Sequence, residues 1–389
     1  MERIRIPDEE YQIRINNAAK LAGEMGLDML IVNGNEADYG NVRYLSGFWP
    51  LFERCGIAIS PSGKAAIMVG PESEYFAARY GRIEKIFILR EYRESADPSY
   101  PELTVSTYRD VARWLGVSGE KLRIGVASWL DTNVIMFNGI KEAFPQAEII
   151  RADSIMKTLR SVKSDNEIAC IREAGRITTK AIQDAINAIR PGMTELQLVG
   201  IAQKSIYEQG AEYEGMPMYI LSNLSTKFAV SRPTYNVFQK GDLIQLNLSA
   251  KVDGYSPSVG CPVCIGKLDG FKRELVEFCF EAHKWTEKSL RAGITASSVS
   301  KDFLQLFKDR GYEKNYLYGP CHGTGLIEVE APWMETNSDY PLHPNMTFEI
   351  DTFAFGDDFG VRWEKPIAIK EGGVEVLGNF KEEIIELDF

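Results

Sequence analysis

An internal repeat in the second half of the chain is the feature that most limits the possible folds. Arg190-Pro-Gly-Met-Thr194 is echoed by Arg291-Ala-Gly-Ile-Thr295, and Glu208-Gln-Gly210 is echoed by Asp309-Arg-Gly311, each 101 residues later (190 to 291 and 208 to 309). Each copy has the pattern of two helices followed by strands. Two copies are too few for a solenoid, which needs at least three. The repeat therefore predicts one domain, built from a duplicated α-α-β-β unit, with a single shared sheet and a cleft between the halves.

The first copy carries two helix-start signals. Ser164 is followed three residues later by Glu167, and Thr194 is followed in the same way by Gln197. This spacing is typical of a capping box, in which two side chains bond the free amides at a helix start. We expect one long helix from Ser164 to about Arg190 and a second helix that begins at Thr194.

The residues before the repeat alternate between helix and strand patterns. Strands are predicted at residues 29–32, 55–60, 64–69, 86–89 and 122–126, and helices at 8–26, 74–80, 104–115 and 132–144. Pro61-Ser-Gly63, between two of the strands, indicates a hairpin turn. We therefore predict a smaller α/β domain over residues 1–156 and the repeat domain over residues 157–389.

Three predicted strands of the repeat domain have polar side chains on one face. In strand order, these side chains are Gln245, Asn247, Ser249, then Glu349, Asp351, then Arg362, Glu364. Such faces either meet water, as is common in antiparallel sheets, or line a shared cavity. Asn247 and Asp351 take similar places in the two copies, which favours the cavity.

A histidine with two nearby glycines adds to this picture. Cys321-His-Gly-Thr-Gly325 interrupts the strand pattern, and glycines after His322 allow the chain to approach a ligand closely. A lone histidine is more often structural. His283 in a predicted helix and His343 in a predicted turn are given no role.

The charge balance excludes some partners. The net charge of −11 argues against binding nucleic acid, which favours clustered Lys and Arg. No apolar run approaches the roughly 18 residues of a membrane span, so we expect no membrane partner. The first residues contain no apolar signal core, which predicts a cytoplasmic protein.

These segments together resemble the family of creatinase, prolidase, aminopeptidase P and methionine aminopeptidase. The matching segments are Arg160-Ser-Val-Lys-Ser-Asp-Asn-Glu167, Gly241-Asp-Leu-Ile-Gln-Leu-Asn247, Asp253-Gly-Tyr255, His322-Gly-Thr-Gly325 and Gly360-Val-Arg-Trp-Glu364. The resemblance covers the second domain well and the first in outline. It implies an α+β chain, with a C-terminal pita-bread domain preceded by the smaller α/β domain. It also implies a homodimer.

The resemblance also assigns metal positions. The family's peptidases bind two divalent ions with two Asp, one His and two Glu. In this chain those positions are Asn247, Ser258, His322, Asp351 and Glu364. Asn247 and Ser258 remove two carboxylates that a two-ion centre needs. Two further family histidines fall at Val329 and near Val230 or Ser231, so neither is present. The last three positions could hold one ion, but we expect no bound metal and no other cofactor.

The resemblance to creatinase, the family's metal-free hydrolase, leads to a functional prediction. We predict a metal-independent hydrolase of a C–N bond in a small amino, betaine or guanidino compound. The predicted catalytic residues are His322, Glu330, Asp351 and Glu364, and the predicted substrate-binding residues are Asn247, Ser258, Arg362, Glu349 and Arg54. In creatinase, an arginine from the partner subunit helps to bind the substrate, and Arg54 lies near the corresponding place in the sequence. The alternative is that Arg54 is a surface charge with no role in binding.

Two other functions stay open. The loss of metal-binding carboxylates is also what a non-catalytic binding or scaffold protein would show. An Xaa-Pro metallopeptidase is the third possibility, which the fold alone supports.

Overall fold

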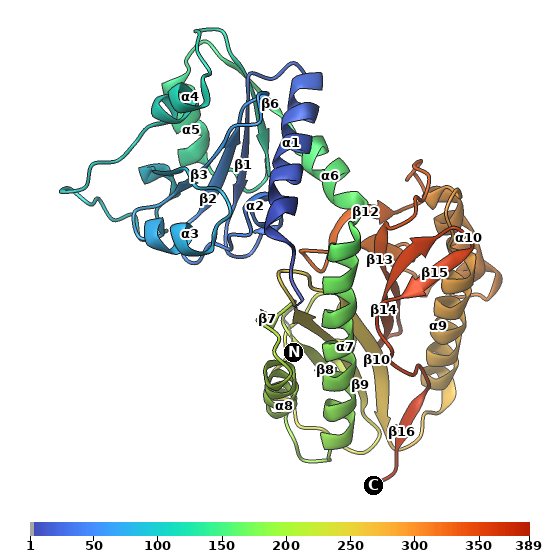
Figure 1. Ribbon diagram of the computed structural model, residues 1–389. Helices are drawn as coiled ribbons and strands as arrows, with labels where there is room; N and C mark the ends of the chain where they lie inside the picture. The colour runs from blue at the N-terminus through green and yellow to red at the C-terminus, as the bar shows by residue number, and fades with distance from the viewer. Residues whose placement is uncertain (1–3) are drawn as a thin grey trace. The chain divides into compact units, whose positions relative to one another are not determined.

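The computed structural model describes residues 4–389, which form two compact units, each with its own sheet. One unit comprises Pro7–Arg160, and the other comprises Ser161–Phe389 together with residues 4–6 (Figure 1). The units divide at the end of helix α6 (Asp153–Ser161), four residues beyond the predicted boundary at residue 156.

The first unit is a six-stranded mixed sheet flanked by helices. Its strand order is β4-β3-β2-β1-β5-β6, with β1 antiparallel to β2 and parallel to β5. The strands are β1 Met29–Gly34, β2 Cys55–Ile59, β3 Ala65–Val69, β4 Ile86–Ile88, β5 Arg123–Ala127 and β6 Glu148–Arg151. The helices are α1 Asp8–Glu24, α2 Gly40–Ser46, α3 Glu74–Tyr80, the 3-10 turn η1 Arg90–Tyr92, α4 Tyr108–Leu115, α5 Val134–Ala143 and α6.

The sequence predicted most of this unit, including the hairpin of β2 and β3. Strand β6 and helices α2 and α6 were not predicted. Helix α4 begins at Tyr108 rather than at residue 104, because Thr107 and Asp110 form a capping box that fixes the first turn.

The second unit is built on a ten-stranded sheet. The main path is β12-β11-β13-β14-β10-β9-β7, with β15 on β14, β16 on β10 and β8 on β9. The strands are β7 Tyr213–Glu214, β8 Tyr219–Ser222, β9 Leu243–Lys251, β10 Ser258–Ile265, β11 Cys321–Gly323, β12 Glu330–Met334, β13 Thr347–Phe355, β14 Gly360–Lys370, β15 Gly373–Val376 and β16 Ile385–Leu387. The helices are α7 Asp165–Ala188, α8 Glu195–Glu208, α9 Gly270–Ser289 and α10 Ala296–Asp309, with 3-10 turns η2 Asn223–Lys227 and η3 Glu313–Asn315.

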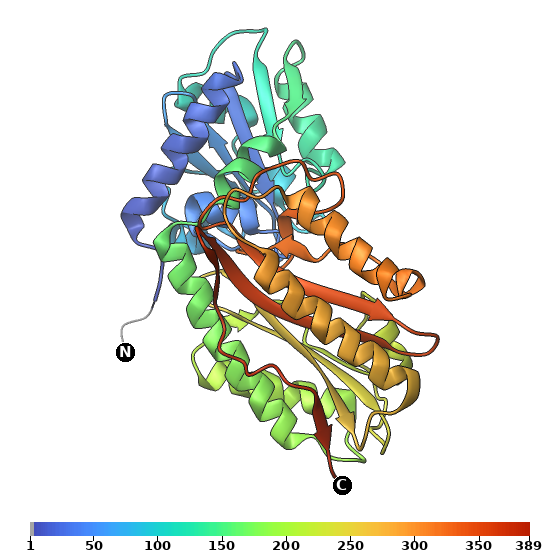
Figure 2. The ribbon, with the colours of Figure 1, turned by 90° about the vertical axis from the view of Figure 1, so that its right-hand side faces the viewer.

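The predicted duplication is confirmed by the helices. Helices α8 and α10 both have 14 residues and begin 101 residues apart (195 to 296). Helices α7 and α9 end 101 residues apart (188 to 289). Helix α7 packs on β9 and β10 and α9 on β13 and β14, and both run along the sheet in Figures 1 and 2. Both capping boxes, at Ser164 and at Thr194, are present.

The two faces of the sheet differ in chemistry. The apolar side chains of β9 and β13, such as Leu246 and Ile350, are fully buried in two core clusters. The polar side chains of the opposite face are buried as well: Asn247 and Glu349 are 0% exposed and Glu364 is 3% exposed. These polar faces do not meet water. The alternative of a shared polar interior is therefore the correct one.

The prediction that residues 321–325 interrupt the strand pattern is wrong for their first part. Cys321–Gly323 forms the short strand β11, which pairs with β12 and β13 and shifts register between His322 and Gly323. Within residues 4–389, no helix combines the length and the apolar character that crossing a membrane requires.

Candidate metal centre

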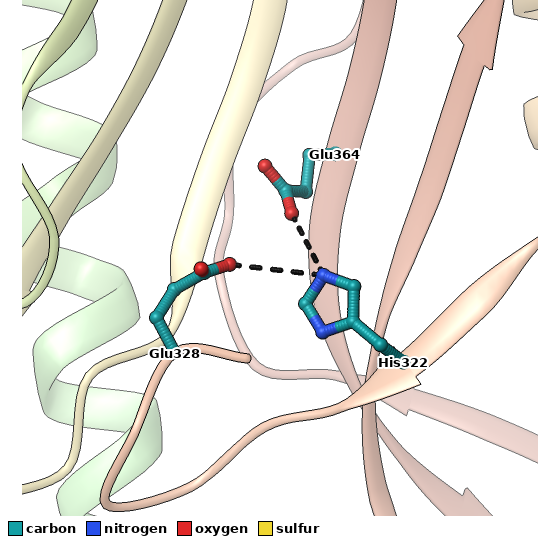
Figure 3. Close-up of side chains that lie close together, drawn as sticks. All are labelled: His322, Glu328 and Glu364. Atoms are coloured by element: carbon teal, nitrogen blue, oxygen red, sulfur yellow. Dashed lines mark ion pairs between the residues drawn. The ribbon is translucent and has the colours of Figure 1, made fainter. Parts of the chain in front are cut away.

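His322 on β11 lies at the centre of a buried cluster of carboxylates. Its Nε2 atom is 3.4 Å from Oε1 of Glu364, 3.8 Å from Oε1 of Glu328 and 3.9 Å from Oδ2 of Asp351. Figure 3 shows the imidazole with Glu364 from β14 on one side and Glu328, from the loop after β11, on the other. The ligand atoms of His322, Glu328 and Glu364 all lie within 4.8 Å of one another.

The other ring nitrogen fixes the state of the imidazole. Nδ1 of His322 is 3.0 Å from the carbonyl oxygen of Gly323. A carbonyl can only accept, so Nδ1 carries a hydrogen and donates it. Nε2 therefore faces the carboxylates. Its lone pair and those of the carboxylate oxygens repel one another unless a proton or a metal ion lies between them.

The charges in this cluster shift the pKa values strongly. Burial opposes a charge on His322, but the hydrogen bond with Glu364 and the nearby Glu328 charge outweigh it and raise the imidazole pKa to about 9. Burial, followed by the charge of Glu364, raises the pKa of Glu328 to about 8. Burial also raises the pKa of Glu349 well above its ordinary value. The cluster thus holds more carboxylates than cations, which favours binding a positive ion.

Asp351 is held at the edge of this group. The Tyr318 hydroxyl donates to its Oδ2 at 2.7 Å, and Arg362 Nε lies 3.2 Å from its Oδ1. Arg362 also donates to Tyr318 and to the backbone carbonyl of Ala229. The guanidinium, predicted to bind substrate, is therefore already used to position Asp351.

The positions predicted for a second ion carry neutral groups. Asn247 on β9 donates a hydrogen bond from its amide nitrogen to Oε2 of Glu364. The backbone amide of Ser258, at the start of β10, donates to Oε1 of Glu349 at 2.9 Å. Both residues are fully buried beside the cluster. The structure thus brings Asn247, Ser258 and Glu349 to the same site as His322.

Two further predicted residues make contacts with other partners. Glu330 forms a buried ion pair with Lys163 at 2.9 Å, and it is not one of the three grouped ligands. Arg54 belongs to the first unit, where it is half-buried and donates to the backbone carbonyl of Arg93.

Sequence reasoning missed Glu328 and Tyr318. Glu328 lies in a loop, where the alternation of side chains along a strand gives no signal. The residue predicted in this segment was Glu330, two positions later. Tyr318 precedes β11 and contacts Asp351 only through the fold. An acidic residue six positions after His322 was the one local signal for Glu328.

Aromatic rings form one wall beside the cluster. The ring of Trp333 on β12 lies 5.3 Å from the His322 ring, and Tyr318 stacks on Phe353 with ring centroids 5.8 Å apart. Trp333 is 37% exposed. The site therefore has an apolar side that reaches solvent next to its charged interior.

Family comparisons match both units. The model of metallopeptidase family M24 matches residues 169–371, and that of the creatinase/prolidase N-terminal domain matches residues 14–162. The chain is 24% identical to an Xaa-Pro dipeptidase of Pyrococcus furiosus over 373 residues (96% of this chain and 99% of the relative). It is 22% identical to an uncharacterized peptidase of Bacillus subtilis over 383 residues (96% and 100%).

Solved structures show the same fold. An X-Pro aminopeptidase of Thermotoga maritima has a TM-score of 0.82 and 22% identity, covering 96% of this chain and 99% of its own. A prolidase of Pyrococcus horikoshii has a TM-score of 0.82 and 22% identity, covering 96% and 100%.

These findings contradict the predicted metal-independent, creatinase-like hydrolase. The matching family is one of metallopeptidases, and relatives from two Pyrococcus species are Xaa-Pro dipeptidases, so the metallopeptidase alternative has the better support. The prediction rested on the neutral groups at Asn247 and Ser258 and overlooked the Glu328 carboxylate, which lies 3.8 Å from Nε2 of His322.

Proposed function

Because this chain belongs to metallopeptidase family M24, we propose that it is a metal-dependent peptidase that cleaves Xaa-Pro dipeptides with a single divalent ion. The observation that carries the proposal is the buried group of His322, Glu328 and Glu364, with ligand atoms within 4.8 Å of one another. Family membership, and with it the predicted pita-bread fold and N-terminal domain, is confirmed.

The residues present fit one ion. One imidazole nitrogen and two carboxylates supply three protein ligands, the number used by catalytic zinc sites, which keep a further position for water or substrate. The hydrogen on Nδ1 of His322, donated to Gly323, leaves Nε2 free to be a ligand. When bound, such an ion polarises a carbonyl and lowers the pKa of a bound water.

The residues present do not fit the family's two-ion centre. Asn247 turns an amide N–H toward Glu364, and a hydrogen-bond donor is not a metal ligand. Ser258 adds a neutral hydroxyl where the resemblance predicts a carboxylate. No part of the proposed function uses a second ion.

The remaining residues would hold and orient the substrate. Asp351 is fixed by Tyr318 and Arg362 at 3.9 Å from His322 Nε2, where its carboxylate can accept a hydrogen bond from an attacking water. The rings of Trp333 and Phe353 provide an apolar wall that suits a prolyl ring. The Xaa-Pro class itself rests on the named relatives, which match along nearly the whole chain.

The test is hydrolysis after metal removal and return. The purified protein is treated with a chelator, dialysed, and assayed for proline release from Xaa-Pro dipeptides with Mn²⁺, Co²⁺ or Zn²⁺. We expect activity that needs one of these ions and that His322→Ala abolishes. His343→Ala, which changes an exposed histidine, is the matched control. Activity that survives chelation, or a folded protein that neither binds metal nor cleaves these dipeptides, would refute the proposal.

The homodimer expected from the family resemblance stays a prediction. Analytical ultracentrifugation of the full chain would measure it.

A further inference from the structure

We infer that a hydrogen-bonded relay from the backbone of Arg362 through Gln245 to Asn247 reserves Glu364 for one metal ion and keeps a second ion out. In this relay Asn247 is a positioning residue that sets the number of ions bound. The inference rests on the proposed metal-dependent function.

The relay begins with a side-chain amide whose orientation is unambiguous. The backbone N–H of Arg362 donates to Oε1 of Gln245 at 2.9 Å, and Nε2 of Gln245 donates to the backbone carbonyl of Arg362 at 3.0 Å. A backbone N–H can only donate and a carbonyl can only accept. The oxygen and nitrogen of the Gln245 amide therefore cannot be exchanged.

This fixed amide orients the next one. Nε2 of Gln245 also donates to Oδ1 of Asn247 at 2.7 Å. Oδ1, the atom of Asn247 that could bind a metal ion, is thereby held toward Gln245. Its Nδ2 hydrogens face the other way and donate to Oε2 of Glu364. Asn247 thus presents a donor where a metal ion would need an electron pair.

The sheet is shaped to admit this amide. Gly260 on β10 is the register partner of both Asn247 on β9 and Glu364 on β14. A Cβ atom at residue 260 would come within 2.5 Å of Asn247 Nδ2. The glycine therefore leaves the space through which the Asn247 amide reaches the Glu364 carboxylate.

The Asn247 amide makes the two oxygens of Glu364 unequal as metal ligands. Oε2 is engaged by Asn247, and Oε1 lies 3.4 Å from Nε2 of His322. A carboxylate that bridges two ions must offer one oxygen to each. Oε2 keeps a second lone pair, but the Asn247 N–H points at it from the side where a second ion would sit, so the oxygen beside His322 is the one open to an ion.

Metal counting tests the relay directly. Full-length protein is equilibrated with Mn²⁺, dialysed and measured by mass spectrometry for Mn²⁺ per chain, with titration calorimetry for affinity. We expect about one ion for the wild type and about two for the double variant Asn247→Asp, Ser258→Asp, which restores both carboxylates. Asn187→Asp adds one negative charge, half that of the double variant, on an exposed face of α7 and should leave the count at one.

A milder variant tests the positioning role. Asn247→Ala removes the donor without adding charge, so the count should stay at one. Loss of an outer hydrogen bond to a ligand typically weakens metal binding by about 10–100-fold, and we expect a weakening in this range. Circular dichroism establishes that each variant is folded.

The outcomes separate this inference from the proposed function. One ion in a folded double variant, or unchanged affinity in Asn247→Ala, would each overturn the relay and leave the proposed function standing. Two ions in the wild type would overturn the relay and the single-ion part of the proposed function, while metal-dependent hydrolysis would stand. No Mn²⁺ in the wild type would overturn both.

Discussion

The two halves of the duplicated sheet share a backbone plan but differ in charge. In the first copy, β9 and β10 bring neutral groups to the site: Gln245, Asn247, Ser249 and Ser258. In the second copy, β11, β13 and β14 bring His322, Glu349, Asp351, Arg362 and Glu364. Duplication has kept the geometry of both halves, whereas the charges needed to bind a cation are concentrated in one. Two halves with the same fold therefore differ in their ability to bind a cation.

The largest expected effect is the loss of a ligand from the charged half. His322→Ala removes the central imidazole, and we expect Mn²⁺ affinity to fall by more than about 100-fold, beyond the usual cost of losing an outer partner. Ser249→Ala, in the neutral half, should change the affinity by far less than the roughly 10-fold typical of a lost outer-shell partner, because its hydroxyl donates to the backbone carbonyl of Pro257. Titration calorimetry measures both. Equal losses would contradict the asymmetry.

The halves should be alike in their contribution to stability. Leu246 on β9 and Ile350 on β13 are each fully buried beneath helices. Removing such a side chain typically costs about 2–5 kcal/mol. Leu246→Ala and Ile350→Ala should both lower the free energy of unfolding within this range, as measured in urea. A cost under about 1 kcal/mol for only one of them would show that the copies are not structurally equivalent.

The opposite face of β14 carries a second charge cluster, whose contribution to the stability of the fold depends on pH. Lys365 contacts Glu382 and Glu287, and Glu382 Oε1 lies 2.7 Å from Nε2 of His283. Burial would raise the pKa of Glu382, but His283 and Lys365 outweigh it and lower the pKa below the ordinary 4.5. A lowered acid pKa stabilises the fold above about pH 4.5, and this contribution is lost as the pH falls below that value.

Replacing the acid should expose this pH dependence. Glu382→Gln should lower the free energy of unfolding at pH 7 by roughly 2 kcal/mol, less than for a fully broken buried pair because Glu287 still contacts Lys365. The difference from the wild type should shrink below pH 4.5. Unfolding curves at pH 7, 5 and 4 measure it, and a difference that grows on acidification would contradict the assigned sign.

The smallest expected effect distinguishes the helix starts. Thr194 accepts a hydrogen bond from the backbone amide of Gln197 and forms a capping box on α8. Its repeat partner Thr295 makes no side-chain cap bond among residues 4–389. Thr194→Ala should cost about 1 kcal/mol of unfolding free energy and Thr295→Ala only a few tenths. Thermal melts of the two variants compare them, and equal shifts would contradict the prediction.

Much of the fold was readable because its signals are local. The 101-residue echo predicted the duplication, the spacing of Ser164 and Glu167 predicted the start of α7, and strand alternation placed Asn247 and Glu364 on polar faces. The echo is recognised by comparing two short motifs, and the other two patterns depend on residues a few positions apart, where helix and strand geometry fix which side chains share a face.

The content of the site depended on contacts between distant parts of the chain. Glu328 joins His322 through a loop with no periodicity, whereas Glu330 turns to Lys163, 167 positions earlier. The direction of the Asn247 amide is set by Gln245 and by the backbone of Arg362, on a strand more than a hundred residues away. Sequence spacing reports which residues can share a face, but packing brings the ligand atoms within a few ångströms and so determines how many ions they can hold.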